Sequence, residues 1–191
     1  MENFKEIVKM TRSFRRFDPT VRISEEELLE FVDSARLAAS GTNKQYLRYR
    51  IVHTEKECDI VYDTLKWGGA FPDWDQPKNE APSSYIVLLR EKDLAPRVGI
   101  DDGLSTQIIT LAATTKGYGT CILQNCAFKD LMANLAIDTD KYVFSLVIAI
   151  GKPIEEVVID EGLVDGNTKY YRDENEVHHV PKRTLADVLV K

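Results

Sequence analysis

Two short apolar runs constrain the fold of this chain more than any other feature. The segments SYIVLLR (84–90) and VFSLVIAIG (143–151) predict strands, and the first is expected to be more fully buried than a strand with one solvent-facing side. Their most apolar parts, Ile86 to Leu89 and Leu146 to Ile150, are far too short to cross a bilayer. The chain is therefore expected to be soluble.

Helical signals precede these strands. Residues 2–10 predict a short helix with one apolar face. Ser24 to Glu27 read as a capping box, in which the serine and the glutamate bond each other's backbone N–H groups, and Ile23 and Leu28 are placed as a hydrophobic staple. The helix that begins there keeps its apolar spacing up to Gly41, a natural stop.

A longer helix is predicted from Gly103 to Lys116, with Gly117 as its cap. Its broad apolar stripe indicates a central, largely buried helix, and the stripe consists of Leu104, Ile108, Leu111, Ala112 and Thr115. The Gly-x-Gly sequence at 117–119 precedes a predicted strand and not a helix. It is therefore interpreted as a helix cap and turn, not as a phosphate-binding loop.

The remaining predicted elements are short, and they are strands at 46–52 and 120–123, helices at 56–65 and 128–135, and a helix that begins at the capping-box-like Thr184. Turn residues flank Tyr170 and Tyr171, so residues 163–180 predict a hairpin or an extended arm. No helix regularly joins successive parallel strands. This mixture indicates the α+β class.

Length, cysteine content and charge narrow the functional classes. With 191 residues, 43% of them hydrophobic, the chain fits one globular domain, residues 1–191. Its start lacks the apolar run of a secretory signal, and its three cysteines lack a C-x-x-C pattern, which is typical of a reduced, cytoplasmic protein without a cysteine metal site. The net charge of -6 argues against a nucleic-acid binder, so any anion site must be local.

The most conspicuous polar cluster is TRSFRRFD, residues 11–18. It is either a solvated helix end or an anion site, because Arg12, Ser13, Arg15 and Arg16 combine guanidinium donors with a hydroxyl. A second basic pair, Lys182 and Arg183, lies beside the start of the last predicted helix. Two such clusters at opposite ends of the chain favour a shared phosphate.

Three other groups of polar residues stand out in the sequence. The loop after the second helix offers amides and hydroxyls to a polar ligand, or is a plain loop; its candidates are Ser40, Gly41, Thr42, Asn43 and Gln45. Gln124 and Asn125 either present donors to a ligand or turn the chain. His178 and His179 are adjacent, point to opposite faces of an extended segment and are interpreted as structural.

In their order and spacing, four segments resemble the FMN-dependent nitroreductase family across nearly the whole chain: TRSFRRFD, AASGTNKQYLRYRIV, DDGLSTQIITLAATTKGYGTCIL and VPKRTLADVLV. The second resembles the serine-x-x-asparagine-x-glutamine loop of that family, and the third its aspartate-x-glycine helix ending in Gly-x-Gly. The resemblance implies a three-layer sandwich, with a mostly antiparallel sheet between helices. It also implies a homodimer with FMN at the subunit interface and an exchanged C-terminal arm.

The resemblance assigns site residues as well. Ser13 would contact the FMN phosphate, Arg15 would face the N1/O2 edge of the flavin, and Lys182 or Arg183 would close on the phosphate. Ser40, Gly41, Thr42 and Asn43 would come from the partner subunit, and Gln124 with Asn125 would face the N5/O4 edge. The family commonly has an arginine where this chain has Thr11, so Arg12 or Arg16 would have to replace it; Tyr46 and Leu47 stand where proline and tryptophan are usual.

The implied activity is a ping-pong transfer of electrons from NAD(P)H through FMN to a nitroaromatic or a quinone, with no catalytic side chain required. Trp67, Phe71 and Trp74 are candidates for the wall of an acceptor site, or are simply core aromatics. Three alternatives stay open: another FMN reaction such as dehalogenation or flavin breakdown, a flavin-binding protein without turnover, and an adaptor that uses the arginine cluster.

Overall fold

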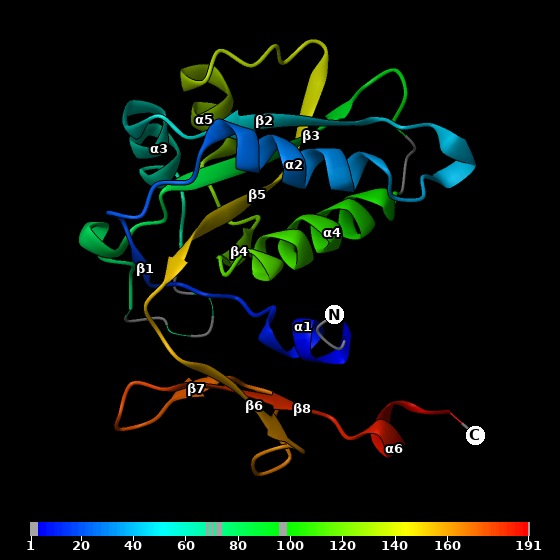
Figure 1. Ribbon diagram of the computed structural model, residues 1–191. Coiled ribbons are helices and arrows are strands. Elements are labelled where there is room, and N and C mark those ends of the chain that lie inside the picture. The colour runs from blue at the N-terminus through cyan, green and yellow to red at the C-terminus, as the bar shows by residue number, and fades with distance from the viewer. Residues whose placement is uncertain (1–3, 68, 70, 72–73, 96–98, 191) are drawn as a thin grey trace.

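The computed structural model describes residues 4–67, 69, 71, 74–95 and 99–190, and its centre is a five-stranded sheet (Figure 1). The sheet runs β2 (Leu47–Val52), β3 (Ser84–Glu91), β5 (Tyr142–Pro153), and the far edge of β5 is shared by β4 (Gly119–Leu123) and β1 (Phe17–Asp18). All of these pairings are antiparallel. The predicted antiparallel sheet is confirmed, although the short β1, inside the arginine stretch, was not predicted.

Helices cover both faces of this sheet. The helices α2 (Glu25–Arg36) and α4 (Asp101–Thr115) pack on one face, and α3 (Glu55–Tyr62) and α5 (Phe128–Asn134) pack on the other. Alternate residues of β3 enter the two cores, Tyr85, Val87 and Leu89 on the α3/α5 side and Ile86 and Leu88 on the α2/α4 side. The α+β class and the three-layer sandwich are confirmed, because β3 is buried on both faces as its apolar run predicted.

Local signals located most element boundaries well. The capping box of Ser24 and Glu27 is present, and Ile23 and Leu28 share one core. The prediction that this helix continues to Gly41 is wrong, since α2 ends at Arg36. The chain leaves the helix there because Ser40 and Gly41 are hydrogen-bonded to the Asp101 carboxylate at the start of α4. Residues Gly41–Asn43 then form a short 3₁₀ turn, η1.

The buried face of α4 was predicted incorrectly. Leu104, in the predicted stripe, is 42% exposed, whereas the residues that are buried are mainly polar: Asp101, Asp102, Ser105, Thr106, Ile109, Thr110, Ala113 and Thr114. The threonine hydroxyls are satisfied inside the helix, as Thr114 donates to the carbonyl of Thr110 at 2.9 Å. The more apolar face of α4 is consequently left partly open in a single chain. Gly117, with φ +78°, ends the helix as predicted.

The last fifth of the chain forms an arm, residues 154–190, with its own small sheet. Its strands are β6 (Val157–Glu161), β8 (His178–Lys182) and β7 (Tyr171–Arg172), in that order. The predicted hairpin is the antiparallel pair β7–β8, while the parallel pair β6–β8 was not foreseen. The arm ends in α6 (Leu185–Val188), whose Thr184/Asp187 capping box is present.

The helix α1 (Phe4–Met10) lies between the main body and the arm in Figure 1. Its predicted apolar face is not buried in one chain, since Phe4 is 68% exposed. The turn η2 (Lys78–Glu80) precedes β3. None of the helices in the described ranges is long and apolar enough to cross a membrane.

Candidate active site

The arginine stretch is held in place by strand β4. Ser13 forms a parallel bridge with Thr120, and the backbone N–H of Phe14 donates to the carbonyl of Thr120 at 2.9 Å. Gly119 makes this close approach possible, because a Cβ added there would lie 2.7 Å from a ring carbon of Phe14. The residues that the sequence grouped as one cationic cluster are thus attached to the edge of the central sheet.

Arg15 is the buried member of the stretch, with 8% of its surface exposed. Its side-chain bonds are to the carbonyl of Ser13 at 3.4 Å and to the phenol oxygen of Tyr170 at 3.3 Å, and its guanidinium lies 4.9 Å from the centre of the Tyr170 ring. Its Nε is buried without a partner, and no carboxylate of the described residues forms an ion pair with it. A buried cation with only neutral partners is a strong seat for an anion.

Arg16 has a different environment. Its Nε and Nη2 donate to the two carboxylate oxygens of Glu80 at 2.6 and 2.8 Å. This bidentate pair satisfies the guanidinium and ties the stretch to η2. Arg16 is therefore already paired, which leaves Arg12 as the candidate to replace the arginine that the family has at the position of Thr11.

A polar cleft of about 180 Å³ lies where the stretch meets α4 and β4, and it is lined by Thr11, Arg12, Ser13, Gln107, Thr110, Thr120 and Ile122. Arg12 donates to the carbonyl of Val8 at 2.7 Å, but its Nε is buried without a partner. Burial lowers the pKa of Arg12. The cleft thus combines a cation that retains an unused donor with several hydroxyl and amide groups, which suits a small anion such as a phosphate.

The loop Ser40 to Gln45 is positioned by Asp101. The Ser40 hydroxyl donates to Asp101 at 2.6 Å and the Gly41 N–H at 3.1 Å, while the Gln45 N–H donates to the Ser40 hydroxyl at 2.9 Å. Thr42, Asn43 and Gln45 adopt positive φ angles of 50°, 55° and 49°. Tyr46, the departure from the family pattern, is buried and donates to Asp102 at 3.2 Å, so the packing behind the loop is intact.

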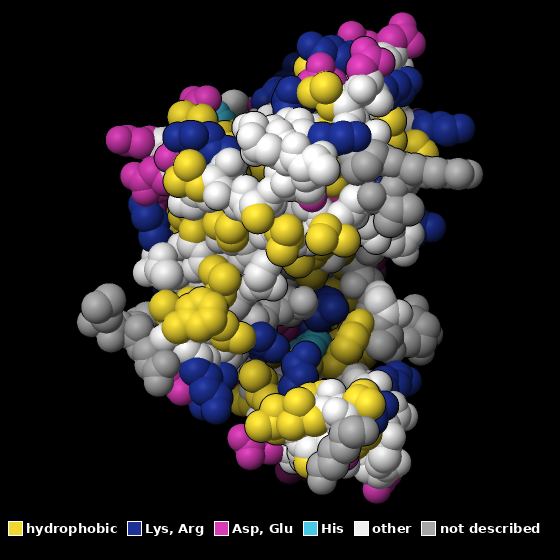
Figure 2. Space-filling view, turned by 90° about the vertical axis from the view of Figure 1, so that its right-hand side faces the viewer, with side chains coloured by type: hydrophobic (Ala, Val, Ile, Leu, Met, Phe, Trp, Pro, Cys, Tyr) yellow, Lys and Arg dark blue, Asp and Glu magenta, His cyan; other side chains and the backbone are white. Residues whose placement is uncertain are grey.

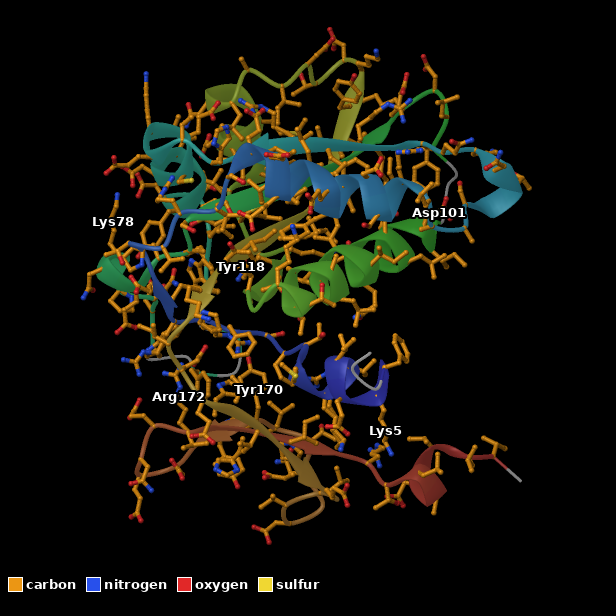
Figure 3. All side chains as sticks on the ribbon, viewed as in Figure 1. Lys5, Lys78, Asp101, Tyr118, Tyr170 and Arg172 are labelled. Atoms are coloured by element: carbon orange, nitrogen blue, oxygen red, sulfur yellow. The ribbon has the colours of Figure 1, made fainter. Side chains whose placement is uncertain are left out.

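The two halves of the predicted site lie at opposite ends of α4. Asp101 holds the loop at the beginning of the helix, whereas Thr11 bonds Thr114 at the other end, at 2.9 Å between hydroxyl oxygens. At 1.5 Å per residue, the separation along the helix is about 20 Å. Figure 3 shows Asp101 well away from Tyr170 and Arg172. A single chain therefore does not bring the Ser40 loop and the arginine stretch together.

The other predicted site residues lie just after strand β4 and on the arm. Gln124 and Asn125 directly follow β4, and the carbonyl of Asn125 accepts from the N–H of Lys66 at 3.0 Å. Lys182 ends β8 and, with Arg183, is exposed on the arm.

The candidate acceptor wall is corrected in part. Trp67 is 3% exposed and packs edge-to-face on Phe17 with centroids 6.5 Å apart, so it is a core residue. Phe71 and Trp74 do line a cleft of about 830 Å³, which is closed on its other side by residues 164–172 and Glu176 of the arm. Part of the predicted lid region, residues 68, 70 and 72–73, lies outside the described residues.

Sequence reasoning missed the residues that join the arm to the body. The side chain of Glu155 is 1% exposed and accepts from the backbone N–H groups of Arg15 and Arg16 and, at 2.9 Å, from Arg172. Arg172 also lies over the ring of Trp74, with its guanidinium 4.8 Å from the ring centre. Only the turn signals around Tyr170 hinted at this part of the site. Figure 2 shows a hollow between body and arm that contains lysine or arginine side chains.

Comparison with protein families decides the relationship, since the model of the nitroreductase family matches residues 8–152. The chain belongs to the nitroreductase family. The match includes the arginine stretch, the Ser40 loop, α4 and β4, and it ends before the arm. The family that the sequence resembled is therefore confirmed by an independent comparison.

The relatives of this nitroreductase-family chain described here are distant in sequence. YdgI of Bacillus subtilis, provisionally named an NAD(P)H nitroreductase, is 23% identical over 188 residues, covering 81% of this chain and 90% of YdgI. A provisionally named nitroreductase from Desulfovibrio desulfuricans, solved in complex with FMN, has a TM-score of 0.71 at 21% identity and covers 100% of this chain and 98% of its own. Another, from Exiguobacterium sibiricum, also with FMN, has a TM-score of 0.67 at 23% identity over 81% of this chain and 90% of its own. These structures establish the fold.

Proposed function

We propose that this protein is an FMN-dependent oxidoreductase that transfers electrons from NAD(P)H to an electron-poor acceptor such as a nitroaromatic or a quinone. The observation that carries the proposal is Arg15, a buried guanidinium without a carboxylate partner in the described part of the chain. Burial of an uncompensated charge is costly, and an anionic ligand would offset the cost. The FMN found in the solved relatives carries a phosphate and a ring edge that becomes electron-rich.

The residues of the chain would share the work of binding. The cleft of Arg12 and Ser13 fits the phosphate, with Arg12 replacing the arginine missing at Thr11. Arg15 would lie along the N1/O2 edge of the ring, and Gln124 with Asn125 would face the opposite edge. Lys182 and Arg183 would approach the phosphate from the arm.

The site would be completed by a second copy of the chain. The Ser40 loop and the arginine stretch lie at opposite ends of α4, and the face of α4 that carries Leu104 is partly exposed. If two copies paired these faces about a two-fold axis, the start of one α4 would meet the end of the other. The exposed apolar residues of the C-terminal tail, Leu185, Val188, Leu189 and Val190, would then have a partner surface to cover.

The chemistry comes from the cofactor: when bound, FMN accepts a hydride from the nicotinamide and passes the electrons to the acceptor. The protein would bind and orient it and exclude water. The cleft at Phe71 and Trp74 offers an aromatic wall for the acceptor. Another FMN reaction, or flavin binding without turnover, is the alternative and uses the same residues.

The test begins with the visible absorption spectrum of the purified protein after addition of FMN and removal of the excess. Bound flavin should bleach anaerobically with NADH or NADPH and recover with a nitroaromatic or a quinone. A bound flavin that neither nicotinamide reduces would support the binding role instead, and a protein that retains no FMN would refute the proposal.

Arg15→Ala isolates the residue on which the proposal rests. Loss of a charge-assisted hydrogen bond costs about 1.5–3 kcal/mol, so FMN affinity should fall roughly 10- to 150-fold. Arg36→Ala is the matched control, because its partner Asp33 is 60% exposed and both lie on the outside of α2. Equal affinity in the two variants, measured by flavin fluorescence titration, would remove Arg15 from the site.

A further inference from the structure

Tyr170 of the arm contacts the guanidinium of Arg15, the group that the proposed function assigns to the edge of the flavin ring. Its phenol oxygen lies 3.3 Å from Nη2 of Arg15, and its ring lies under the guanidinium at 4.9 Å. Figure 3 places Tyr170 and Arg172 at the junction of the arm with the body. A buried cation over an aromatic face is stabilised, more so when both are desolvated.

Aromatic neighbours fix the Tyr170 ring in this position. His178, which is 1% exposed, stacks on it with centroids 5.2 Å apart and planes at 27°. Phe71 meets it edge-on at 5.1 Å. The Nδ1 of His178 is buried without a partner, so this side of the cluster lacks a complete set of hydrogen bonds. Tyr170 therefore contacts Arg15 from within a packed aromatic cluster, through a phenol oxygen and a ring face.

The arm is anchored two residues further on. Arg172 is on the same side of its strand as Tyr170, since side chains alternate along a strand. It pairs with Glu155 at 2.9 Å, with 11% and 1% of the two side chains exposed. Tyr171, between them, points the other way: it stacks on His179 at 4.8 Å and donates to Asp160 at 3.3 Å. Tyr170 thus lies on a short segment that is anchored by the two residues that follow it.

We propose that the arm gates the flavin site of its own chain. Tyr170 contacts the guanidinium of Arg15 and must move away before the cofactor binds. The inference rests on the proposed function. A neutral phenol and a π face satisfy Arg15 less well than an anionic edge, so the exchange favours the ligand. Only the fraction of molecules with Tyr170 displaced would accept FMN, which lowers the apparent affinity and the rate of association by that fraction.

The test measures FMN association by stopped-flow quenching of flavin fluorescence in the full-length apoprotein. Tyr170→Ala should raise the association rate constant roughly tenfold or more, as expected when a minor open state becomes the main one. Tyr142→Ala is the control, because Tyr142 lies at the start of β5, at the end of the strand remote from β1 and the arm, and this variant should bind FMN at the wild-type rate. Tyr170→Phe keeps the ring packing and loses the 3.3 Å bond, so its rate should be intermediate.

If Tyr170 is instead a permanent wall of the flavin site, the variants should show the opposite pattern of FMN association rates. If Tyr170 stayed in place and contacted the bound flavin, Tyr170→Ala would bind at an unchanged rate and release FMN faster, and that result would overturn the gate while leaving the proposed function intact. A Tyr170→Phe rate equal to wild type, together with a slower Tyr170→Ala, would overturn it as well. Wild-type protein that takes up no FMN in an equilibrium titration would overturn the proposed function and the gate together.

Discussion

Replacing Glu155 with glutamine tests the contact that joins the arginine stretch to the arm. The carboxylate is 1% exposed and bonds three donors: the backbone N–H groups of Arg15 and Arg16, the latter at 3.1 Å, and Nη2 of Arg172 at 2.9 Å. Glutamine has nearly the same shape and keeps one carbonyl oxygen, but it removes the close, buried charge that, among the described residues, compensates Arg172.

The size of the stability loss depends on which charges remain near Arg172 after the substitution. Among the described residues, the next carboxylate near Arg172 is that of Glu176, 3.9 Å from Nη1 and itself 68% exposed, which is too distant and too hydrated to substitute. Breaking a buried ion pair by removing one partner costs about 3–5 kcal/mol, and the retained oxygen favours the lower end, about 3 kcal/mol. For a chain of this length, that loss lowers Tm by roughly 6–12 °C.

Thermal and urea unfolding at one fixed protein concentration would measure this difference, because association with a second copy shifts apparent stability. Asp33→Asn is the control; its pair with Arg36 is 60–62% exposed and should be worth about 0.2–1 kcal/mol. The double variant Glu155→Gln with Arg172→Met should recover part of the loss, since no unpaired charge remains buried. A loss below about 1 kcal/mol in Glu155→Gln would refute the reasoning.

Two further predictions concern the same region. Gly119→Ala should displace Phe14, whose ring carbons lie 2.7–2.8 Å from the added Cβ, and should thereby weaken FMN binding by fluorescence titration as well as lower Tm. Burial, with the positive charge of Arg15, lowers the pKa of His178 from 6.5 to about 4. The unfolded chain therefore takes up the proton first as the pH falls, and stability should decline between pH 6.5 and 4 by at most roughly 3 kcal/mol, a slope that His178→Phe should lack in urea unfolding.

The sequence predicted those parts of the fold that depend on neighbours along the chain. The strand β3 reads as a continuous apolar run because both of its faces are buried, and the capping box of Ser24 and Glu27 needs only residues three positions apart. The face of α4 was misjudged because periodicity follows apolar residues. Here Thr110 and Thr114 are buried instead, with their hydroxyls bonded to carbonyls of the same helix.

The candidate site was only half predictable for a different reason. The residue types of the stretch 11–18 left a solvated helix end and an anion site both open, and they did not show which arginine was left for a ligand. That depends on Glu80 and Glu155, which lie 64 and about 140 positions away in the sequence. Side-chain pairing over such separations leaves no periodic signal. Tyr170 was noted only as part of a turn-flanked segment, and its contact with Arg15 spans 155 positions.

The partners of the three arginines in the stretch 11–18 explain why an acidic protein concentrates cations there. Arg16 is neutralised by Glu80, and Arg12 donates to the free carbonyl of Val8 at the end of α1, where a positive charge is favoured. Arg15 is the most buried of the three, and within the described part of the chain its side chain bonds only a carbonyl and a phenol. A carboxylate in place of Tyr170 would hold Arg15 more tightly and would also compete with an anionic ligand. Because Tyr170 is neutral and lies on an anchored arm, the apoprotein stays packed and the charge of Arg15 remains available to the ligand.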